Sequence, residues 1–174
     1  MKAPMKFLKS LFSPSREVHC EFGRPAPLIP LAAIGDIHGR VDLLEKLLPR
    51  LEPDLQVICV GDYIDRGDHS ADVLRFLQAN PEIICLKGNH EEMLLNFIDQ
   101  PETYGRRWFR NGGLQTMASF GIAGLTETSP DERLRMARDA LVKAMGDPLI
   151  DWLDGLQSGW RAGNLAVVHA GADP

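Results

Sequence analysis

This chain has no excess of positively charged side chains. Its 174 residues hold 19 lysine and arginine side chains against 24 aspartate and glutamate side chains, which gives a formal charge of -5. A chain this acidic has no overall field that attracts nucleic acid. Any phosphate group that it binds must be held by a local cluster of metal ions or basic side chains. We therefore expect no nucleic-acid partner.

Cysteine is scarce as well. The chain has three, Cys20, Cys59 and Cys85, and the last two lie inside apolar runs. An odd number of cysteines placed in this way disfavours a disulfide framework and favours buried free thiols in a reducing compartment. The sequence therefore predicts a cytoplasmic protein.

The N-terminus lacks a continuous apolar run after its lysines, so neither a signal peptide nor a membrane span is expected there. Met1–Phe12 alternates lysine with phenylalanine and leucine, which favours a solvated tail. The alternative is a short basic amphipathic helix that touches a membrane surface or a partner. Residues 13–30 are rich in Pro, Ser and Gly and resemble a linker or a strap over the surface. We expect residues 1–30 to be a basic tail with a Pro-rich linker and residues 31–174 to be one domain.

From residue 31 onward, short apolar runs alternate with helical patterns. Strands are predicted at Leu31–Ile34, Gln56–Val60 and Ile83–Leu86, and helices at Arg40–Leu51, Ser70–Asn80 and Glu91–Asp99. Ser70 is the expected N-cap of the second helix, and Pro81 ends it. Strands that alternate with helices indicate parallel βαβ units.

A helical insertion is predicted over about residues 101–157. A helical pattern covers Tyr104–Phe120 and is divided by Gly112-Gly113. A capping box at Ser129–Glu132 predicts the start of a further helix, and Asp147-Pro148 predicts the start of another. Residues 158–164 resemble a turn-rich connection, and Leu165–Val168 is a predicted strand that leads to His169. We find no internal repeat in the chain.

Polar motifs follow the predicted strands. They are Gly35-Asp36-Ile37-His38-Gly39, Gly61-Asp62-Tyr63-Ile64-Asp65-Arg66-Gly67, Gly88-Asn89-His90-Glu91 and His169-Ala170-Gly171. Ligands of α/β proteins bind at the carboxyl ends of the strands, so we expect these side chains to meet at one edge of a sheet.

These motifs carry candidate metal ligands. Asp36 and His38 are two residues apart on an extended segment, so their side chains can point the same way and bind one metal ion. Asp62 has two oxygens for two cations, Asn89 offers a neutral oxygen, and His169 offers a nitrogen. Each of these residues could instead have a structural role. Asp36 and His38 could lie on a solvated loop, Asn89 could occupy a left-handed turn, and His169 could be a core histidine. Their joint placement after strands favours a metal site, and oxygen ligands mixed with imidazole suit Mn, Fe or Zn.

The four motifs, in this order, resemble those of the calcineurin-like metallophosphoesterases, in the branch that contains phosphoprotein phosphatases and bacterial diadenosine tetraphosphate hydrolases. The resemblance covers about residues 31–174. It implies an α/β fold, a metallophosphoesterase-type α/β/β/α sandwich with mixed sheets and helices outside. It also implies two divalent metal ions at the strand ends, with Mn expected and Fe or Zn as alternatives.

The same resemblance implies roles for the motif residues. Asp36, His38 and Asp62 would hold the first metal ion, and Asp62, Asn89 and His169 the second. Two ions about 3.5–4 Å apart lower the pKa of a bridging water and stabilise the phosphoryl oxygens. His90 would be the general acid that protonates the leaving oxygen, and Asp65 would orient it.

Substrate contacts are expected from basic and polar side chains near the motifs. Arg66 has a planar fork that suits two phosphoryl oxygens, and the alternative is a salt bridge with Asp65 or Asp68. Lys87 stands where phosphoprotein phosphatases commonly have an arginine. A lysine there keeps the positive charge but cannot donate two parallel hydrogen bonds to one phosphoryl group. Arg110 and Asn111 are candidates for contact with the substrate, and the neighbouring Trp108 and Phe109 are expected to pack the helical insertion.

Relatives in this family continue beyond the His-Ala-Gly motif with further strands and a histidine that binds the second metal ion. None of the five histidines of this chain follows His169. The resemblance therefore leads us to expect a domain that is incomplete at its C-terminus, binds the first metal ion more firmly than the second, and hydrolyses phosphoesters weakly.

The expected function is metal-dependent hydrolysis of a phosphoester, with a phosphorylated protein or a small phosphoester as partner and a Ser/Thr phosphoprotein phosphatase as the nearest type. The alternative is hydrolysis of a dinucleoside polyphosphate such as diadenosine tetraphosphate. A second alternative is a truncated, inactive metal-binding module.

Overall fold

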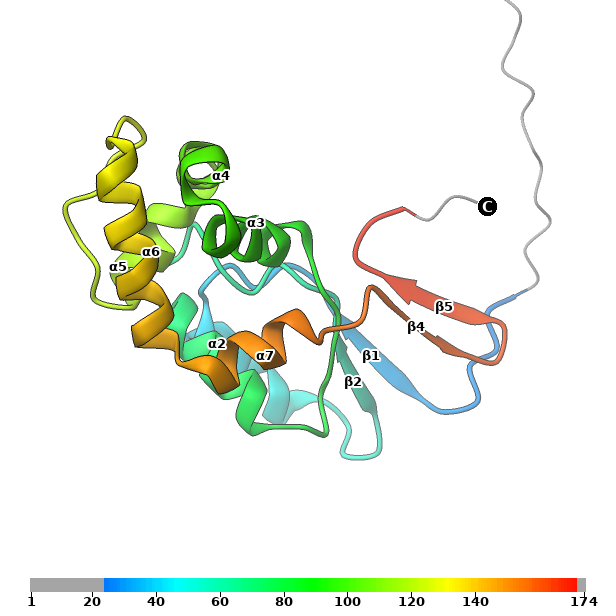
Figure 1. Cartoon of the computed structure of the whole chain (residues 1–174). Coiled ribbons are helices and arrows are strands. Elements are labelled where there is room, and N and C mark those ends of the chain that lie inside the picture. Colours follow the sequence, from blue (N-terminus) through cyan, green and yellow to red (C-terminus); the bar gives the residue numbers. More distant parts are fainter. Residues whose placement is uncertain (1–23, 172–174) are drawn as a thin grey trace, which may run out of the picture.

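A parallel sheet of three strands lies at the centre of the fold. The computed structural model describes residues 24–171, so the predictions for the basic tail and Cys20 lie outside the described residues. The strands are β1 (Leu31–Ile34), β2 (Gln56–Cys59) and β3 (Ile84–Cys85), in the order β1-β2-β3. Both pairs are parallel, with Leu31 opposite Gln56 and Cys59 opposite Cys85. The predicted strands and their parallel βαβ arrangement are confirmed (Figure 1).

A helix follows each of these strands. They are α1 (Val41–Leu47), extended by the 3-10 turn η1 (Leu48–Arg50), α2 (Ser70–Ala79) and α3 (Asn89–Asp99). The predicted N-cap at Ser70 is wrong, because His69 is the N-cap and Ser70 is the first helical residue. The hydroxyl of Ser70 instead accepts a hydrogen bond from the backbone N–H of Asp65, at 3.1 Å.

The segment predicted as a helical insertion is largely helical, with a break at Gly112. Its elements are α4 (Pro101–Trp108), the π-helical turn η2 (Phe109–Gly113), α5 (Leu114–Ser119), α6 (Asp131–Met145) and α7 (Asp147–Asp154). Gly112, at φ 108°, interrupts the helical backbone between α4 and α5. The capping box at Ser129 is wrong: Pro130 is the N-cap of α6, and the Ser129 hydroxyl accepts the N–H of Thr126 in the preceding turn, at 3.0 Å.

The strand predicted at Leu165–Val168 is confirmed, and a second strand precedes it where a turn-rich connection was expected, so the two form a β-hairpin. β4 (Gly159–Ala162) pairs antiparallel with β5 (Leu165–Val168) across the two-residue turn Gly163-Asn164. Gly159, Gly163 and Asn164 indicated a loop. Gly163 and Asn164 instead form a tight turn, with Gly163 at φ 60°. The side chain of Asn164 also binds the segment before β1, through the N–H of Ala26 and the carbonyl of Arg24.

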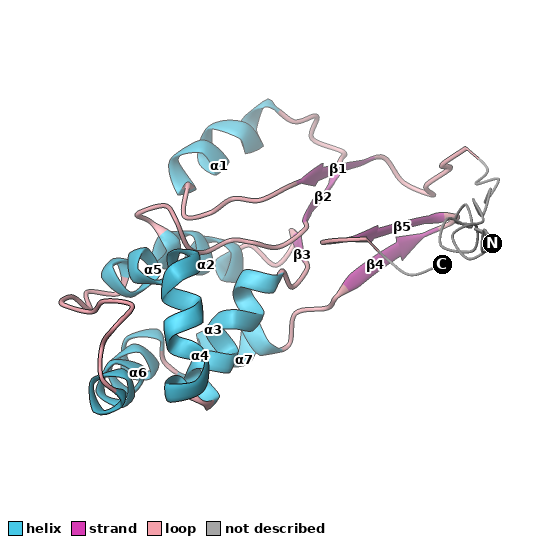
Figure 2. Cartoon of the chain, turned by 90° about the horizontal axis from the view of Figure 1, so that it is seen from above, coloured by secondary structure: helices cyan, strands magenta, loops and turns pink. Residues whose placement is uncertain are grey.

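The hairpin is joined to the parallel sheet near the motifs. Gln157 forms an isolated parallel bridge with Leu86, and its carbonyl accepts the N–H of Lys87 at 2.8 Å. Figure 2 shows α4, α5 and α6 gathered at the end of the molecule opposite the hairpin. The polar motifs therefore lie between the helical insertion on one side and β5 on the other.

One apolar core runs from the sheet into the insertion. Its largest fully buried side chains include Tyr63, Phe97, Leu94, Trp108, Leu134 and Leu141. The predicted core packing of Trp108 and Phe109 is confirmed, since both rings lie against Phe97 at centroid distances of 4.9 and 5.5 Å. Within residues 24–171, no helix is both long and apolar enough to cross a membrane.

Tyr63 links two strands from inside this core. Its buried hydroxyl lies 2.9 Å from the carbonyl of Cys59 and 2.6 Å from that of Leu86. We expect Tyr63→Phe to lower the free energy of unfolding by about 1–2 kcal/mol, since the carbonyls lose a buried donor. Urea denaturation measures the change. Tyr104→Phe is the control, because the Tyr104 hydroxyl makes no hydrogen bond to another described residue; equal stabilities of the two variants would contradict the prediction.

Candidate active site

The loops that follow β1 and β2 are bonded directly to one another. The N–H groups of Ile37 and His38 both donate to the carbonyl of Asp62, at 3.0 and 2.8 Å, and Gly39 donates to Tyr63 at 2.8 Å. Parallel strands end at the same edge of a sheet, so this ladder holds the first two motifs against each other. The predicted convergence of these two motifs is confirmed.

Strained backbone is concentrated in the same two loops. The non-glycine residues with positive φ among residues 24–171 are His38 at 43°, Asp62 at 55°, Asp65 at 72° and Arg66 at 67°. Such conformations cost on the order of 1–3 kcal/mol each and persist where the surroundings enforce them, often at functional sites. The backbone here is shaped to place particular side chains.

Two glycines allow the second and third motifs to approach. A Cβ atom on Gly88 would lie 2.4 Å from the backbone nitrogen of Asp62, and one on Gly61 would lie 2.5 Å from the nitrogen of Gly88. Any larger residue at either position would push the motifs apart. Gly61 and Gly88 are therefore required by close packing.

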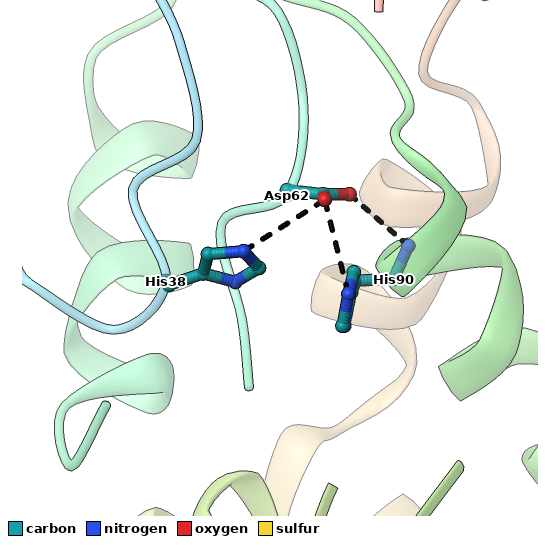
Figure 3. A group of neighbouring side chains, drawn as sticks. All are labelled: His38, Asp62 and His90. Carbon is teal, nitrogen blue, oxygen red and sulfur yellow. Dashed lines mark hydrogen bonds and ion pairs between the residues drawn. The ribbon is translucent and has the colours of Figure 1, made fainter. Parts of the chain in front are cut away.

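Asp62 lies at the centre of the resulting cluster. It is 5% exposed, and its carboxylate lies 3.9 Å from the Nε2 atom of His38, 3.8 Å from that of His90 and 3.3 Å from that of His169. Asp36, which is exposed, lies 3.7 Å from Nε2 of His38. Figure 3 shows the imidazoles of His38 and His90 on the same side of the Asp62 carboxylate.

Two of these imidazoles are oriented by backbone carbonyls. Nδ1 of His38 lies 2.7 Å from the carbonyl of Ile64, and Nδ1 of His169 lies 2.9 Å from that of Val60. A carbonyl only accepts, so each ring carries a proton on Nδ1, and Nε2, which faces Asp62, is the nitrogen that can bind a metal ion. This is the arrangement that metal-binding histidines adopt.

The donor set fits divalent metal ions. Two groups of potential ligand atoms lie within 4.8 Å of one another, His38 with Asp62 and His90, and Asp36 with Asp62 and His169. Asp62 is common to both. Carboxylate oxygens together with neutral imidazole nitrogens suit Mn, Fe or Zn.

Asn89 adds an oxygen to this cluster. Its Oδ1 atom lies 3.0 Å from Nε2 of His169, close enough for both atoms to bind one cation. The alternative of a left-handed turn at Asn89 is wrong, because this residue opens α3 and does not have a positive φ.

Glu91 is a site residue that the sequence reasoning missed. Its fully buried carboxylate accepts the N–H groups of Asp62, Tyr63 and Gly88, at 2.8, 2.8 and 2.9 Å. Burial raises the pKa of this carboxyl above its ordinary value. Glu91 thus fastens the second motif to the third, and its position three residues after Gly88, typical of a capping box, was the available signal.

His90 is held by Asp65. Its Nδ1 atom lies 2.6 Å from Oδ2 of Asp65, and both side chains are buried. Burial lowers the pKa of His90. The hydrogen bond to Asp65 and the negative charges of Asp65 and Asp62 raise this pKa by more than burial lowers it, so the pKa lies above its ordinary value. The partner of His90 is thus a carboxylate, whereas the partners of His38 and His169 are neutral carbonyls.

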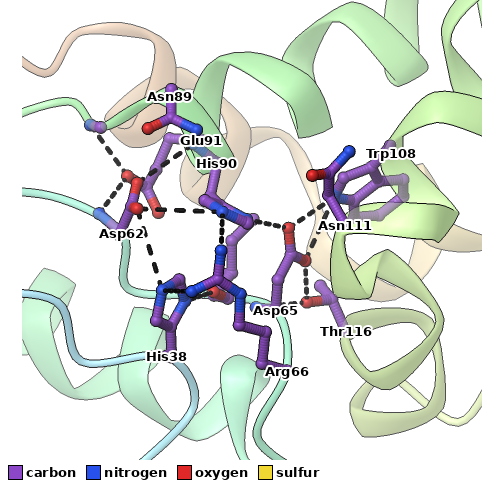
Figure 4. A network of polar contacts seen from close by, with 12 residues as sticks. His38, Asp62, Asp65, Arg66, Asn89, His90, Glu91, Trp108, Asn111 and Thr116 are labelled. Atoms are coloured by element: carbon purple, nitrogen blue, oxygen red, sulfur yellow. Dashed lines mark hydrogen bonds and ion pairs between the residues drawn. The ribbon is translucent and has the colours of Figure 1, made fainter.

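Further polar groups surround Asp65. The indole N–H of Trp108 donates to both carboxylate oxygens, at 3.1 and 2.8 Å, and the Thr116 hydroxyl donates to Oδ1 at 2.6 Å. Figure 4 shows this network extending from Asp62 through His90 and Asp65 to Trp108 and Thr116. The sequence predicted only a packing role for Trp108, and no sequence motif included Thr116.

Arg66 lies over the cluster. Its guanidinium contacts Nε2 of His38 at 2.8 Å and Nε2 of His90 at 3.1 Å. Among the ion pairs of residues 24–171 there is none between Arg66 and Asp65 or Asp68, so the salt-bridge alternative is wrong. Arg66 therefore contacts two imidazoles of the cluster, and its role in substrate binding stays a prediction.

The other predicted substrate contacts lie apart from Asp62. Lys87 donates to the backbone carbonyl of Asp154 at 2.7 Å, at the end of α7. Arg110 and Asn111 are exposed on η2 and donate to the carbonyls of Arg106 and Arg107, one turn earlier. None of the three contacts the cluster in this arrangement, and their roles stay predictions.

The cysteines within the described residues take no part in the site. Cys59 and Cys85 are free and lie on neighbouring strands inside the sheet. Burial raises the pKa of the Cys59 thiol to about 12 and that of the Cys85 thiol to about 11. The prediction of free thiols at these two positions is confirmed.

Comparison with known proteins agrees with this geometry. The family model of the calcineurin-like phosphoesterases matches residues 29–160, and the chain belongs to this family. The family is metal-dependent, so divalent metal ions are implied. The predicted α/β metallophosphoesterase fold is confirmed.

Particular relatives fall into two groups. Over 83 residues the chain is 43% identical to serine/threonine-protein phosphatase 2 of Escherichia coli (strain K12), an alignment that covers 46% of this chain and 37% of that protein. Over 152 residues it is 30% identical to the asymmetrical bis(5'-nucleosyl)-tetraphosphatase PrpE of Bacillus velezensis, covering 79% of this chain and 55% of the relative. The crystal structure of a candidate diadenosine tetraphosphatase superposes with a TM-score of 0.50 at 22% identity, covering 80% of this chain and 49% of that one. The chain thus spans between about a third and a half of the length of these relatives.

Proposed function

We propose that this chain hydrolyses phosphoesters at a two-metal site centred on Asp62. The observation that carries the proposal is the Asp62 carboxylate at the strand ends, faced by three imidazole Nε2 atoms, two of them oriented through Nδ1 by backbone carbonyls. Asp36, His38 and Asp62 would hold one ion, and Asp62, Asn89 and His169 the other. The bound ions would supply an activated water and stabilise charge on the phosphoryl oxygens.

We propose Mn as the metal, with Fe or Zn as alternatives. Oxygen ligands outnumber nitrogen ligands in the proposed sets, which favours a harder ion over one that prefers thiolates. Asp36 and Asp62 place two carboxylates around the first ion. The second has Asp62 and a neutral Asn89 oxygen, so we expect weaker binding there.

His90 is proposed as the proton donor to the leaving oxygen. Its buried ring directs Nε2 toward the cluster while Nδ1 is held by Asp65 at 2.6 Å, so the ring cannot rotate without losing that bond. A general acid in this position contributes typically about 10²–10⁴-fold to the rate. Asp65 orients the ring and stabilises its charged form.

Arg66 is proposed to bind the phosphoryl oxygens through its guanidinium, which lies beside the imidazoles of His38 and His90. With a metal ion on Nε2 of His38, the guanidinium would have to exchange that imidazole for the phosphoryl oxygens. Lys87, Arg110 and Asn111 are proposed as outer contacts to the rest of the substrate. Each would have to exchange its present backbone partner for the substrate.

Arg66→Lys tests the phosphate contact. We expect kcat/KM to fall about 10-fold or more with metal affinity unchanged, because lysine keeps the charge but loses the two-pronged hydrogen bond. Steady-state kinetics and a metal titration measure the two quantities. Arg161→Lys, on the exposed face of β4, is the matched control, and similar kinetics for both variants would contradict the role.

The proposed substrate is a Ser/Thr phosphoprotein, with a dinucleoside polyphosphate as the second candidate. A relative that is 43% identical over 83 residues is named a Ser/Thr phosphatase, whereas a tetraphosphatase that is 30% identical aligns over 152 residues. A cytoplasmic location is proposed on the basis of the free thiols. An inactive metal-binding module is the remaining alternative.

The test uses the purified chain with Mn supplied, on a phosphoserine peptide and on diadenosine tetraphosphate, each with a chelator control. We expect chelator-sensitive hydrolysis, with the higher kcat/KM on the peptide. A reversed preference would replace the leading substrate by the second candidate. Bound metal without hydrolysis of either substrate would support the inactive module and overturn the proposal.

A further inference from the structure

We infer that Trp108 and Thr116, which belong to the helical insertion, are positioning residues for His90 and act on it through Asp65. This inference rests on the proposed function, in which His90 is the proton donor. It assigns to the insertion a role in the chemistry itself, beyond packing.

The contacts of Asp65 carry the inference. Its carboxylate is fully buried and has three side-chain donors: the His90 ring at 2.6 Å, the Trp108 indole at 2.8 Å and the Thr116 hydroxyl at 2.6 Å. A buried charge is tolerated only where hydrogen bonds replace its water. Two of the three donors come from the insertion, so the insertion determines where this carboxylate can sit.

Thr116 also fixes the backbone of Asp65. Its hydroxyl oxygen accepts the N–H of Asp65 at 2.9 Å and lies 3.1 Å from the Ser70 hydroxyl. Asp65 has a φ of 72°, a conformation that a non-glycine residue keeps only under constraint. One threonine thus holds both the main chain and the carboxylate of the residue that orients His90.

The position of the Trp108 ring depends on Gly113 and on two aromatic neighbours. A Cβ atom on Gly113 would lie 2.5 Å from the indole ring, so only glycine fits beneath it. The ring packs on Phe97 and Phe109 at centroid distances of 4.9 and 5.6 Å. The turn η2, in which Gly112 breaks the helical backbone, separates Trp108 from Thr116.

The same turn reaches Arg66. The carbonyl of Gly112 accepts the N–H of Arg66 at 3.3 Å, and a Cβ atom on Gly112 would lie 2.7 Å from that nitrogen. The segment from Trp108 to Thr116 therefore supports the proposed acid partner and the proposed phosphate-binding arginine together. Packing alone would not require an indole N–H and a hydroxyl aimed at one carboxylate.

Kinetics with two leaving groups separate positioning from packing. An alkyl phosphate needs a proton on its leaving oxygen, whereas an aryl phosphate with an acidic phenol hardly does. We expect Thr116→Val to lower kcat about 10–100-fold on the alkyl phosphate and less than about threefold on the aryl phosphate, with Thr116→Ser restoring the loss. Thr103→Val, at an exposed position of α4, is the matched control. Equal losses on both substrates, or none, would overturn the inference.

A second readout does not depend on activity. In the metal-free chain, the Nδ1 proton that His90 shares with Asp65 should give a low-field NMR resonance, assigned by its loss in His90→Asn. Thr116→Val and Trp108→Phe should shift it, and Thr103→Val should not. Trp108→Phe keeps an aromatic ring, so it supports the test if Thr116→Val does not fold.

The two failures are distinguishable. If the chain hydrolyses nothing and the resonance shifts as expected, the proposed function is wrong and the link from the insertion to His90 stands. If the chain hydrolyses phosphoesters and neither the resonance nor the leaving-group dependence responds, the inference is wrong and the proposed function stands.

Discussion

Asp62→Asn is expected to remove metal binding at both sites and lower kcat by roughly 10³-fold or more, since the bound ions supply several kcal/mol of charge stabilisation. Asparagine keeps the size of the side chain but loses the charge and the second ligand oxygen. The reason for so large an effect is the position of Asp62, which is shared by both groups of potential ligands.

Calorimetric titration with Mn and steady-state kinetics test this. Asp72→Asn is the control, because Asp72 is an exposed aspartate on α2 that pairs with His69. Circular dichroism establishes that both variants fold. Two ions bound by Asp62→Asn with unchanged affinity would show that Asp62 is not shared between them.

The second large effect is expected for His90→Asn, with kcat reduced about 10²–10⁴-fold on a substrate that has a poor leaving group. Metal affinity should change little. The structure also offers the competing assignment of His90 as a ligand, since its Nε2 atom lies 3.8 Å from Asp62, close to the 3.9 Å of His38.

The metal titration decides between these assignments. As a proton donor, His90 can be replaced while the Mn affinity stays within about threefold of the original, because its Nδ1 partner is Asp65 and the ring is not needed as a ligand. As a ligand, its loss would weaken binding far more. His69→Asn, in an exposed pair with Asp72, is the matched control.

The metal cluster could be predicted from the sequence because its residues follow strands. Periodicity located β1, β2 and β3, and parallel pairing forces their carboxyl ends to one edge, so Asp36, His38 and Asp62 had to meet there. His169 follows a strand of the hairpin instead, and its bond to Val60 brings it to the same edge.

The supporting residues could not be predicted in this way. Ser70 and Ser129 carry signals of helix capping, yet their hydroxyls accept N–H groups in neighbouring turns, because such side chains bind whichever backbone donor the local turn presents. Thr116 is 51 residues from Asp65 along the chain. No local sequence pattern predicts a contact between residues so far apart along the chain.

The first strand of the hairpin, β4, was missed for a different reason. Gly159, Gly163 and Asn164 are typical of loops, but a tight two-residue turn uses the same residues. The strand β4 begins at Gly159 and has only four residues, too few for a clear alternation. Composition alone does not separate a hairpin turn from an open connection.

The measurement that most directly tests the shared role of Asp62 is electron paramagnetic resonance of the chain during titration with Mn. Two ions that share a carboxylate are magnetically coupled. We predict a signal from one tightly bound ion at low Mn, replaced by a coupled two-ion signal as the second, weaker site fills. A spectrum of isolated Mn ions at every ratio, with hydrolysis present, would contradict a two-metal site centred on Asp62.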